Sequence, residues 1–196
     1  MFFSPRAAAI PALCAWLLLA GPAPAVAQEH VAPPLPVVDL SAGYMFMYDT
    51  DIAESFPKGW YFGSAVNLNT WFGVAFEVSG SHKRISAVQF DAFTYMAGPR
   101  FFQKTGRLVP FAQFLTGLAH GRAKITPPPE FGYGPFTTSS DNFAIQPGGG
   151  VTILLTDHVG LRVATDYRCI MNFDDGVEYT NEFRVTSGMT FHWGAR

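Results

Sequence analysis

Apolar and polar residues alternate with a period of two along eight segments of this chain. In the first segment, for example, Val38 and Leu40 fall on one parity and Asp39 and Ser41 on the other. Successive side chains of a strand point to opposite faces, so this alternation predicts β-strands with one apolar face. The predicted strands cover residues 38–48, 60–68, 72–78, 93–101, 109–119, 143–153, 159–168 and 182–193.

The connections between these segments alternate between short and long. The short ones are residues 69–70, 103–107 and 156–158, and the long ones are 49–59, 80–89, 122–141 and 172–181. Short turns at one end and long loops at the other are typical of outer-membrane barrels, whose tilted strands cross a bilayer with about nine to eleven residues. The pattern predicts an all-β fold: an eight-stranded antiparallel up-and-down transmembrane β-barrel with its long loops outside the cell.

Two features predict that the apolar parity faces lipid. The opposite parity is mostly Gly, Ala, Ser, Thr and Asn, which suits a narrow barrel interior better than a water-covered surface. Aromatic residues of the apolar parity gather near the strand ends, as in the interfacial girdles of membrane barrels. They are Tyr48, Trp60, Phe62 and Tyr167 toward the loops, and Phe72, Phe101, Phe191 and Trp193 toward the turns. A soluble, lipocalin-like ligand-binding barrel also has eight alternating strands and is the alternative.

Two prolines interrupt the predicted strands. Pro99 and Pro147 lie at interior positions of their segments, and proline has no N–H to donate to a strand ladder. We therefore expect bulges or register breaks at both prolines, one of them marked by residues 148–150, which are all glycine.

Charged residues are scarce, and the predicted strands place them on the polar parity. Of 196 residues, 14% are charged and 48% hydrophobic, and the net charge of −2 excludes a strongly basic nucleic-acid-binding protein. A lone charge in a narrow barrel is costly, so the balanced signs predict ion pairs that plug the lumen, with Asp39, Arg100 and Arg162 as a group nearer the turns. The predicted lumen charge network consists of Asp39, Glu77, Arg100, Arg162, Asp166, Arg168, Glu182 and Arg184.

The N-terminus has the pattern of a cleaved signal peptide. Arg6 precedes an apolar run, and Ala25-Val26-Ala27 is a small-x-small cleavage site. We expect residues 1–27 to be the signal peptide, residues 28–36 a periplasmic N-terminal segment and residues 37–193 the outer-membrane barrel. Removal of the signal leaves one cysteine, Cys169, so we expect no internal disulfide.

The last strand carries a motif with a known counterpart. Within residues 186–193, Thr186, Gly188, Phe191 and Trp193 resemble the assembly signal on the C-terminal strand of bacterial outer-membrane barrels, although this chain continues to residue 196. The stretch YMAGPRF, residues 95–101, is similar to the porin-family, outer-membrane-protein-A-like β-barrel domain. The resemblance implies a location in the bacterial outer membrane. It also implies contact with outer-membrane lipid and lipopolysaccharide, and insertion by the barrel assembly machinery with periplasmic chaperones.

Candidate catalytic chemistry is sparse. The five histidines are scattered without metal-ligand spacing, so we expect neither a metal site nor a cofactor. Some eight-stranded barrels modify the acyl chains of lipid A, and such an enzyme needs a Ser/His pair with an acidic orienter. The close grouping here is Glu77, Ser79, Ser81 and His82. We expect a non-enzymatic protein with a structural or surface-interaction role, and a lipid A deacylase-like enzyme is the alternative.

Overall fold

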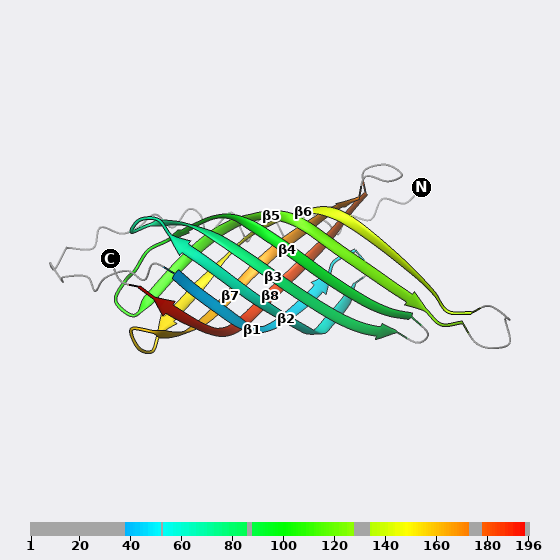
Figure 1. Cartoon of the computed structure of the whole chain (residues 1–196), viewed down its shortest axis with the longest axis horizontal. Coiled ribbons are helices and arrows are strands. Elements are labelled where there is room, and N and C mark those ends of the chain that lie inside the picture. The colour runs from blue at the N-terminus through cyan, green and yellow to red at the C-terminus, as the bar shows by residue number, and fades with distance from the viewer. Residues whose placement is uncertain (1–37, 52, 86–87, 128–133, 173–177, 195–196) are drawn as a thin grey trace. The chain divides into compact units, whose positions relative to one another are not determined.

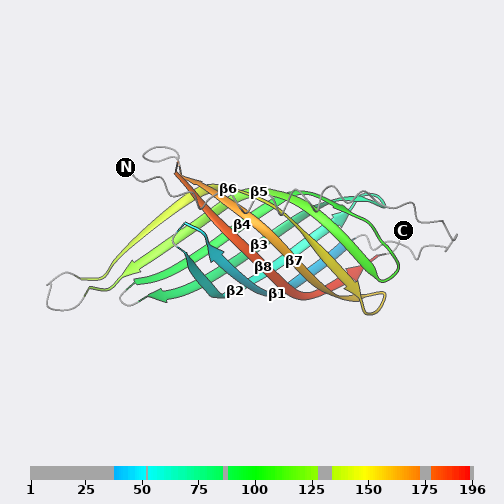
Figure 2. The ribbon, with the colours of Figure 1, turned by 180° about the vertical axis from the view of Figure 1, so that it is seen from behind.

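The structure, a computed structural model, describes residues 38–51, 53–85, 88–127, 134–172 and 178–194. These residues form β1 (Val38–Asp49), β2 (Glu54–Asn67), β3 (Phe72–Ile85), β4 (Val88–Phe102), β5 (Leu108–Ile125), β6 (Phe136–Leu154), β7 (Val159–Asn172) and β8 (Glu178–Trp193). Each strand is antiparallel to its neighbours in sequence, and β8 pairs with β1 to close the barrel (Figures 1 and 2). The predicted fold class is therefore confirmed. The predicted signal peptide and the segment 28–36 lie outside the described residues.

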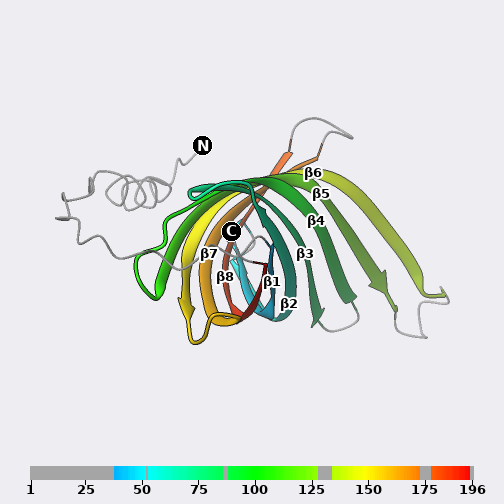
Figure 3. The same cartoon turned by 60° about the vertical axis from the view of Figure 1, so that its left-hand side comes forward.

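Several strands extend beyond the predicted segments at one end of the barrel. The β3–β4 ladder continues to Ile85 opposite Val88, and the β5–β6 ladder continues to Ile125 opposite Phe136 (Figure 3). Much of the predicted loops 80–89 and 122–141 is thus paired hairpin. Beyond the apolar wall neither face of a strand has to be apolar, so the alternation stops before the hydrogen-bonded ladder does.

Pro99 and Pro147 leave the register of their strands intact, contrary to expectation. Pro99 pairs with β3 opposite Val74, whereas the β4–β5 ladder omits it and resumes in the same register. Pro147 likewise pairs with β5, and the β6–β7 ladder omits it. A missing N–H affects the ladder with one neighbour only, so each loss stays on one side of the strand. The register shift in the described ladders lies between β1 and β2, at Met45 and Met47.

The outer wall of the barrel is apolar across the middle of every strand. We call the large exposed side chains there the apolar belt: Tyr44, Phe62, Val66, Phe76, Tyr95, Phe101, Phe114, Leu118, Phe143, Ile153, Leu161, Val163, Tyr167, Phe183, Val185, Met189 and Phe191. At the turn end, Trp71 stacks on Phe101 with ring centroids 6.0 Å apart, and Phe191 lies 6.1 Å from Trp193. An apolar surface of this extent is covered by lipid rather than water. A soluble ligand-binding barrel requires the opposite polarity.

The barrel closes at a pair of glycines, Gly43 on β1 opposite Gly188 on β8. A Cβ atom at Gly43 would lie 2.1 Å from the carbonyl oxygen of Ser187, and one at Gly188 would lie 2.1 Å from the carbonyl oxygen of Ala42. The two backbones are too close for any side chain, so this seam requires glycine on both strands.

Substitution of Gly188 tests the seam. We expect Gly188→Val to push β8 away from β1 and to lower the free energy of unfolding by about 1–3 kcal/mol, the usual cost of overpacking. The measurement is urea unfolding in phospholipid vesicles, followed by tryptophan fluorescence. Ser187→Val is the matched control, because Ser187 lies on the exposed outer face of the same strand. Equal stability of the two variants would contradict the glycine requirement.

Candidate functional site: the charged barrel interior

The structure places all eight residues of the predicted lumen charge network inside the barrel. Each is at most 7% exposed, although each is ionisable. They come from β1, β3, β4, β7 and β8, so residues distant in sequence meet in the interior. Burial of this degree requires every charge to find a partner, and the partners are distributed over three groups.

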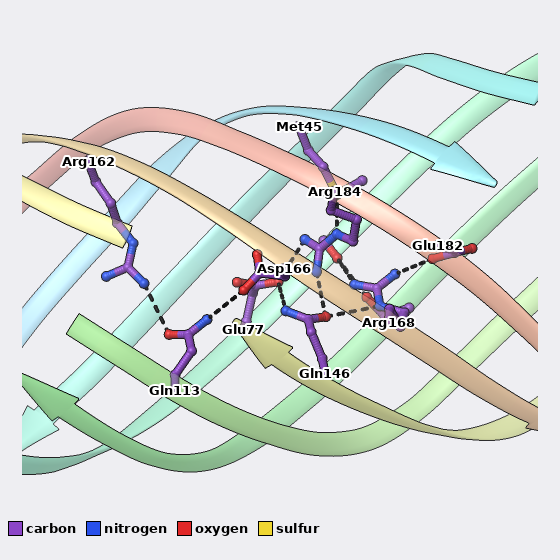
Figure 4. A network of polar contacts seen from close by, with 11 residues as sticks. Met45, Glu77, Gln113, Gln146, Arg162, Asp166, Arg168, Glu182 and Arg184 are labelled. Atoms are coloured by element: carbon purple, nitrogen blue, oxygen red, sulfur yellow. Dashed lines mark hydrogen bonds and ion pairs between the residues drawn. The ribbon is translucent and has the colours of Figure 1, made fainter. Parts of the chain in front are cut away.

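The upper cluster, nearer the long hairpins, contains Glu77, Gln146, Arg168, Glu182 and Arg184 (Figure 4). The Arg184 guanidinium donates to Glu77 Oε1 at 2.8 Å, and the Arg168 guanidinium donates to Glu182 Oε2 at 3.3 Å. Both arginines also donate to the side-chain oxygen of Gln146, whose amide nitrogen donates to Glu77 Oε1 at 3.3 Å. The result is one connected set of charge-assisted hydrogen bonds rather than two separate ion pairs.

Neutral side chains complete the coordination of the two arginines. Arg168 donates to Ser79 Oγ at 3.1 Å, and this hydroxyl lies 2.6 Å from the Thr94 hydroxyl. Arg184 Nε lies 3.1 Å from Met45 Sδ. Each guanidinium is therefore held from several strands at once, which fixes its plane as well as its charge.

The middle group joins Arg162 to Asp166 through Gln113 (Figure 4). Arg162 donates to Gln113 Oε1 at 3.1 Å, and Gln113 Nε2 donates to Asp166 Oδ1 at 3.3 Å. The Arg162 guanidinium also lies 3.9 Å from the centre of the Phe111 ring, a cation–π contact. We expected Arg162 to join Asp39 near the turns, and its hydrogen bond instead connects it toward Asp166.

Gly148 makes room for the Asp166 carboxylate. The two residues lie opposite each other on β6 and β7, and a Cβ atom at Gly148 would lie 2.0 Å from Asp166 Oδ1. The β6–β7 ladder runs through residues 148–150 without a shift. The glycine run was expected to mark a bulge, but here it provides space for a lumen side chain.

The lower cluster, nearer the short turns, is centred on Asp39. Arg100 donates to Asp39 Oδ2 at 3.0 Å, and His192 Nδ1 lies 2.8 Å from Asp39 Oδ1. Asn67 also donates to Asp39 Oδ2, at 3.3 Å. The Arg100 guanidinium lies 4.7 Å from the centre of the Phe111 ring, so this one ring contacts an arginine from the lower cluster and one from the middle group.

Small cavities remain between these side chains. One of about 10 Å³ lies beside Arg100, Gln113 and Arg162, and another of about 20 Å³ lies beside Thr152 and His192. A volume of this size holds about one water molecule. Both are therefore buried-water sites in size rather than ligand pockets.

Sequence reasoning missed Gln113, Gln146 and His192. All three lie on the inward parity, and each is at most 5% exposed. The prediction followed formal charge alone, so it passed over uncharged amides and an imidazole. Polarity on the inward parity is the signal that identifies them.

The grouping that sequence suggested for catalysis is divided between the two faces of the wall. Glu77 and Ser79 belong to the lumen, whereas His82 lies on the outer face, with its Nδ1 2.5 Å from Asp91 Oδ1. That hydrogen bond keeps the pKa of Asp91, which lies beyond the apolar belt, below its usual value. Within the described chain, His82 has no hydrogen bond to a serine. Among the same residues, no three His, Cys, Asp or Glu side chains are placed to hold a metal ion.

The four residues of the predicted assembly signal lie on β8. Thr186 is buried on the inward face, and Gly188 lies at the closing seam. Phe191 and Trp193 are exposed on the outer wall at the turn end. The motif thus places its two aromatic rings toward lipid and its small residues against β1.

Comparisons with known proteins identify the fold. No family model matches the sequence, and no curated protein matches it either. The crystal structure of Neisserial surface protein A is similar, with a TM-score of 0.59 and 14% identity over 80% of this chain and 96% of that chain. OprG from Pseudomonas aeruginosa gives a TM-score of 0.54 and 10% identity over 83% and 98%. Ail of Yersinia pestis gives 0.51 and 16% over 79% and 96%. The chain has the fold of an eight-stranded outer-membrane β-barrel.

Removal of one buried partner tests the upper cluster. We expect Glu77→Gln to leave Arg184 without its carboxylate and to lower the free energy of unfolding by about 3–5 kcal/mol. Urea unfolding in phospholipid vesicles measures it. The matched control is Glu54→Gln, because Glu54 pairs with Lys83 at the half-exposed rim and such pairs are worth about 0–1 kcal/mol. A loss below about 1 kcal/mol for Glu77→Gln would mean that the cluster does not stabilise the barrel.

Proposed function

We propose that the protein is a non-enzymatic outer-membrane β-barrel whose lumen is plugged by its own side chains and whose hairpins have a structural or surface-interaction role. The observation that supports this proposal most strongly is that the two faces of the barrel wall have opposite polarity. Charged residues are buried inside and large apolar residues are exposed outside. This arrangement suits a bilayer around the barrel and a solid interior within it.

The hydrogen bonds of the lumen support the plug. The arginines of the upper cluster are each bonded to groups from more than one other strand. An ion pathway would have to separate these guanidinium groups from Glu77 and Glu182. Leaving buried charges unpaired costs several kcal/mol for each pair, so the closed arrangement is strongly favoured.

The long hairpins are the parts best placed to meet a partner outside the cell. β5 and β6 have 18 and 19 residues, more than the other strands, and their ladder projects past the neighbouring hairpins (Figure 3). Loops and hairpins held by a rigid scaffold commonly carry binding functions. Ail is named as an attachment invasion locus protein and Neisserial surface protein A as a surface protein, and a surface role is the corresponding proposal for this chain.

For assembly we propose the route that the C-terminal motif implies. Periplasmic chaperones would deliver the chain, and the barrel assembly machinery would recognise Thr186, Gly188, Phe191 and Trp193. The exposed, outward position of both aromatic rings on the closing strand supports this.

Single-channel recording tests the plug. We expect the refolded protein to give no steady, large conductance in a planar lipid bilayer, and the double variant Arg168→Ala/Arg184→Ala to give one. Those two side chains fill the width of the upper lumen, and their removal leaves hydrated carboxylates. The control Arg84→Ala/Arg107→Ala removes the same charge from exposed positions and is expected to stay silent. Steady conductance of the unmodified protein, or silence of the lumen variant, would contradict the plug.

The C-terminal motif is tested by removing its rings. We expect Phe191→Ala/Trp193→Ala to reduce the amount of protein in the outer-membrane fraction that shows heat-modifiable migration on a gel. The control Phe183→Ala/Val185→Ala removes two lipid-facing side chains from the same strand, farther from its end. Equal yields of the two variants would mean that lipid-facing area, not recognition of the motif, governs insertion.

A further inference from the structure

The outer wall of the long hairpins carries a cluster of charged and histidine side chains that the lumen does not use. They occupy the outward-facing positions of β3, β4, β5 and β6 in the part of each strand beyond the apolar belt. We call this set the basic rim patch: His82, Arg84, Asp91, His120, Arg122, Lys124 and Asp141. The strand register brings them together, because His82 lies opposite Asp91, Asp91 opposite Arg122, and His120 opposite Asp141. Directly opposite residues have Cβ atoms about 5 Å apart, so the patch is continuous.

The two acidic residues of the patch are engaged by histidines. His82 Nδ1 lies 2.5 Å from Asp91 Oδ1, and His120 Nδ1 lies 2.7 Å from Asp141 Oδ1. The three remaining cations are exposed, and among the described residues no carboxylate lies within ion-pair distance of them. They are Arg84, Arg122 and Lys124. Arg122 nevertheless lies opposite Asp91, and its charge helps to lower the pKa of that carboxyl. The patch thus has a net positive charge, and the N–H donors of Arg84, Arg122 and Lys124 are available to a ligand.

The patch lies immediately above the lipid-facing wall. Phe93 is opposite His120, and its ring contacts Trp60 edge-on with centroids 6.4 Å apart. Two residues below them, Tyr95 and Leu118 are exposed members of the apolar belt. Aromatic rings of this kind mark the interface between hydrocarbon and headgroups. Arg122 is about 7 Å farther along its strand than His120, at the level where headgroups begin.

At this end of the barrel, charged side chains at outward-facing positions are concentrated on β3–β6, although Lys58 on β2 and Glu178 on β8 are also exposed. The outward residues at the corresponding ends of β7, β8 and β1 are uncharged. They include Cys169, Met171, Tyr179, Asn181 and Tyr48. The register places Gln89 between Arg84 and Lys124, and Asp91 beside Arg122, so the three cations lie near one another, an arrangement that suits an anionic ligand.

We propose that the basic rim patch binds the phosphate groups of lipid A in the outer leaflet. This rests on the outer-membrane placement of the proposed function. Arginine binds phosphate through paired N–H donors and lysine binds it as a point charge, so Arg122 and Lys124 on one strand suit a multiply charged headgroup. The side chains point outward from the barrel wall just above the apolar belt. One lipid can therefore contact the belt with its acyl chains and the patch with its phosphates. The plug is not involved in this contact.

The test is a titration with lipid A in neutral-detergent micelles. The refolded protein is expected to bind diphosphorylated lipid A, and Arg122→Gln/Lys124→Gln to raise the apparent dissociation constant about tenfold to thirtyfold. The matched control is Arg107→Gln, which removes an exposed arginine at the turn end and is expected to bind as the parent does. Raising the salt from 0.1 M to 1 M should weaken the parent's binding and leave the double variant nearly unchanged, because screening acts on the removed charges.

Three outcomes would overturn the proposal. They are equal binding of dephosphorylated lipid A, unchanged binding by the double variant, and full competition by millimolar inorganic phosphate, which would indicate a small-anion site. Heat-modifiable migration shows that each variant is folded. Because conductance is recorded separately, a leaky barrel that binds lipid A would refute only the plug. A silent barrel that ignores lipid A phosphates would refute only this proposal.

Discussion

Backbone hydrogen bonding within lipid is the constraint from which the rest of this structure follows. The bilayer core contains no water to pair with an exposed N–H or C=O, so a sheet that enters it must close on itself. This chain closes through twelve residue pairs between β1 and β8, from Val38 opposite Trp193 to Asp49 opposite Glu182. Eight strands enclose an interior only wide enough for side chains. In a closed barrel the inward side chains must therefore fill the lumen, and the polar ones among them must find hydrogen-bond and charge partners in one another.

Two glutamines, Gln113 and Gln146, connect most of the charged side chains in the lumen. A carboxylate only accepts hydrogen bonds and a guanidinium only donates them, whereas an amide does both. Gln146 accepts from Arg168 and Arg184 and donates to Glu77, and Gln113 accepts from Arg162 and donates to Asp166. Gln113 thus bridges Arg162 and Asp166, and Gln146 joins Arg168 to the Arg184–Glu77 ion pair, in both cases without adding any charge. The eight ionisable residues, four of each sign, become connected groups rather than isolated pairs.

The parts of this fold that alternation predicts are those where lipid enforces it. The apolar belt and the inward charges follow from parity, because a polar residue against lipid is costly at every such position. The hairpin extensions of β5 and β6 lie beyond the lipid-facing wall, where a polar residue carries no such cost. The alternation of apolar and polar residues therefore does not predict them. Parity also places Arg162 inside but leaves open which neighbour it reaches across the lumen, since that depends on tilt and stagger. Pro99 was misjudged for a local reason: one lost N–H interrupts one ladder, and the other keeps the register.

The same kinds of side chain behave differently on the two faces of the wall. In the lumen, acids and bases are balanced, and arginines pair with Asp39, Glu77 and Glu182, because an excess charge away from bulk solvent is costly. On the outer face of the long hairpins, histidines contact Asp91 and Asp141. The cations above the belt, Arg84, Arg122 and Lys124, are exposed. An excess of positive charge is stable there only beside water or anionic headgroups. The longest strands, β5 and β6, are also those that lift Arg122, Lys124 and Asp141 past the apolar belt. Hairpin length and charge placement therefore act together, because the extended ladder holds these residues in fixed outward positions above the belt.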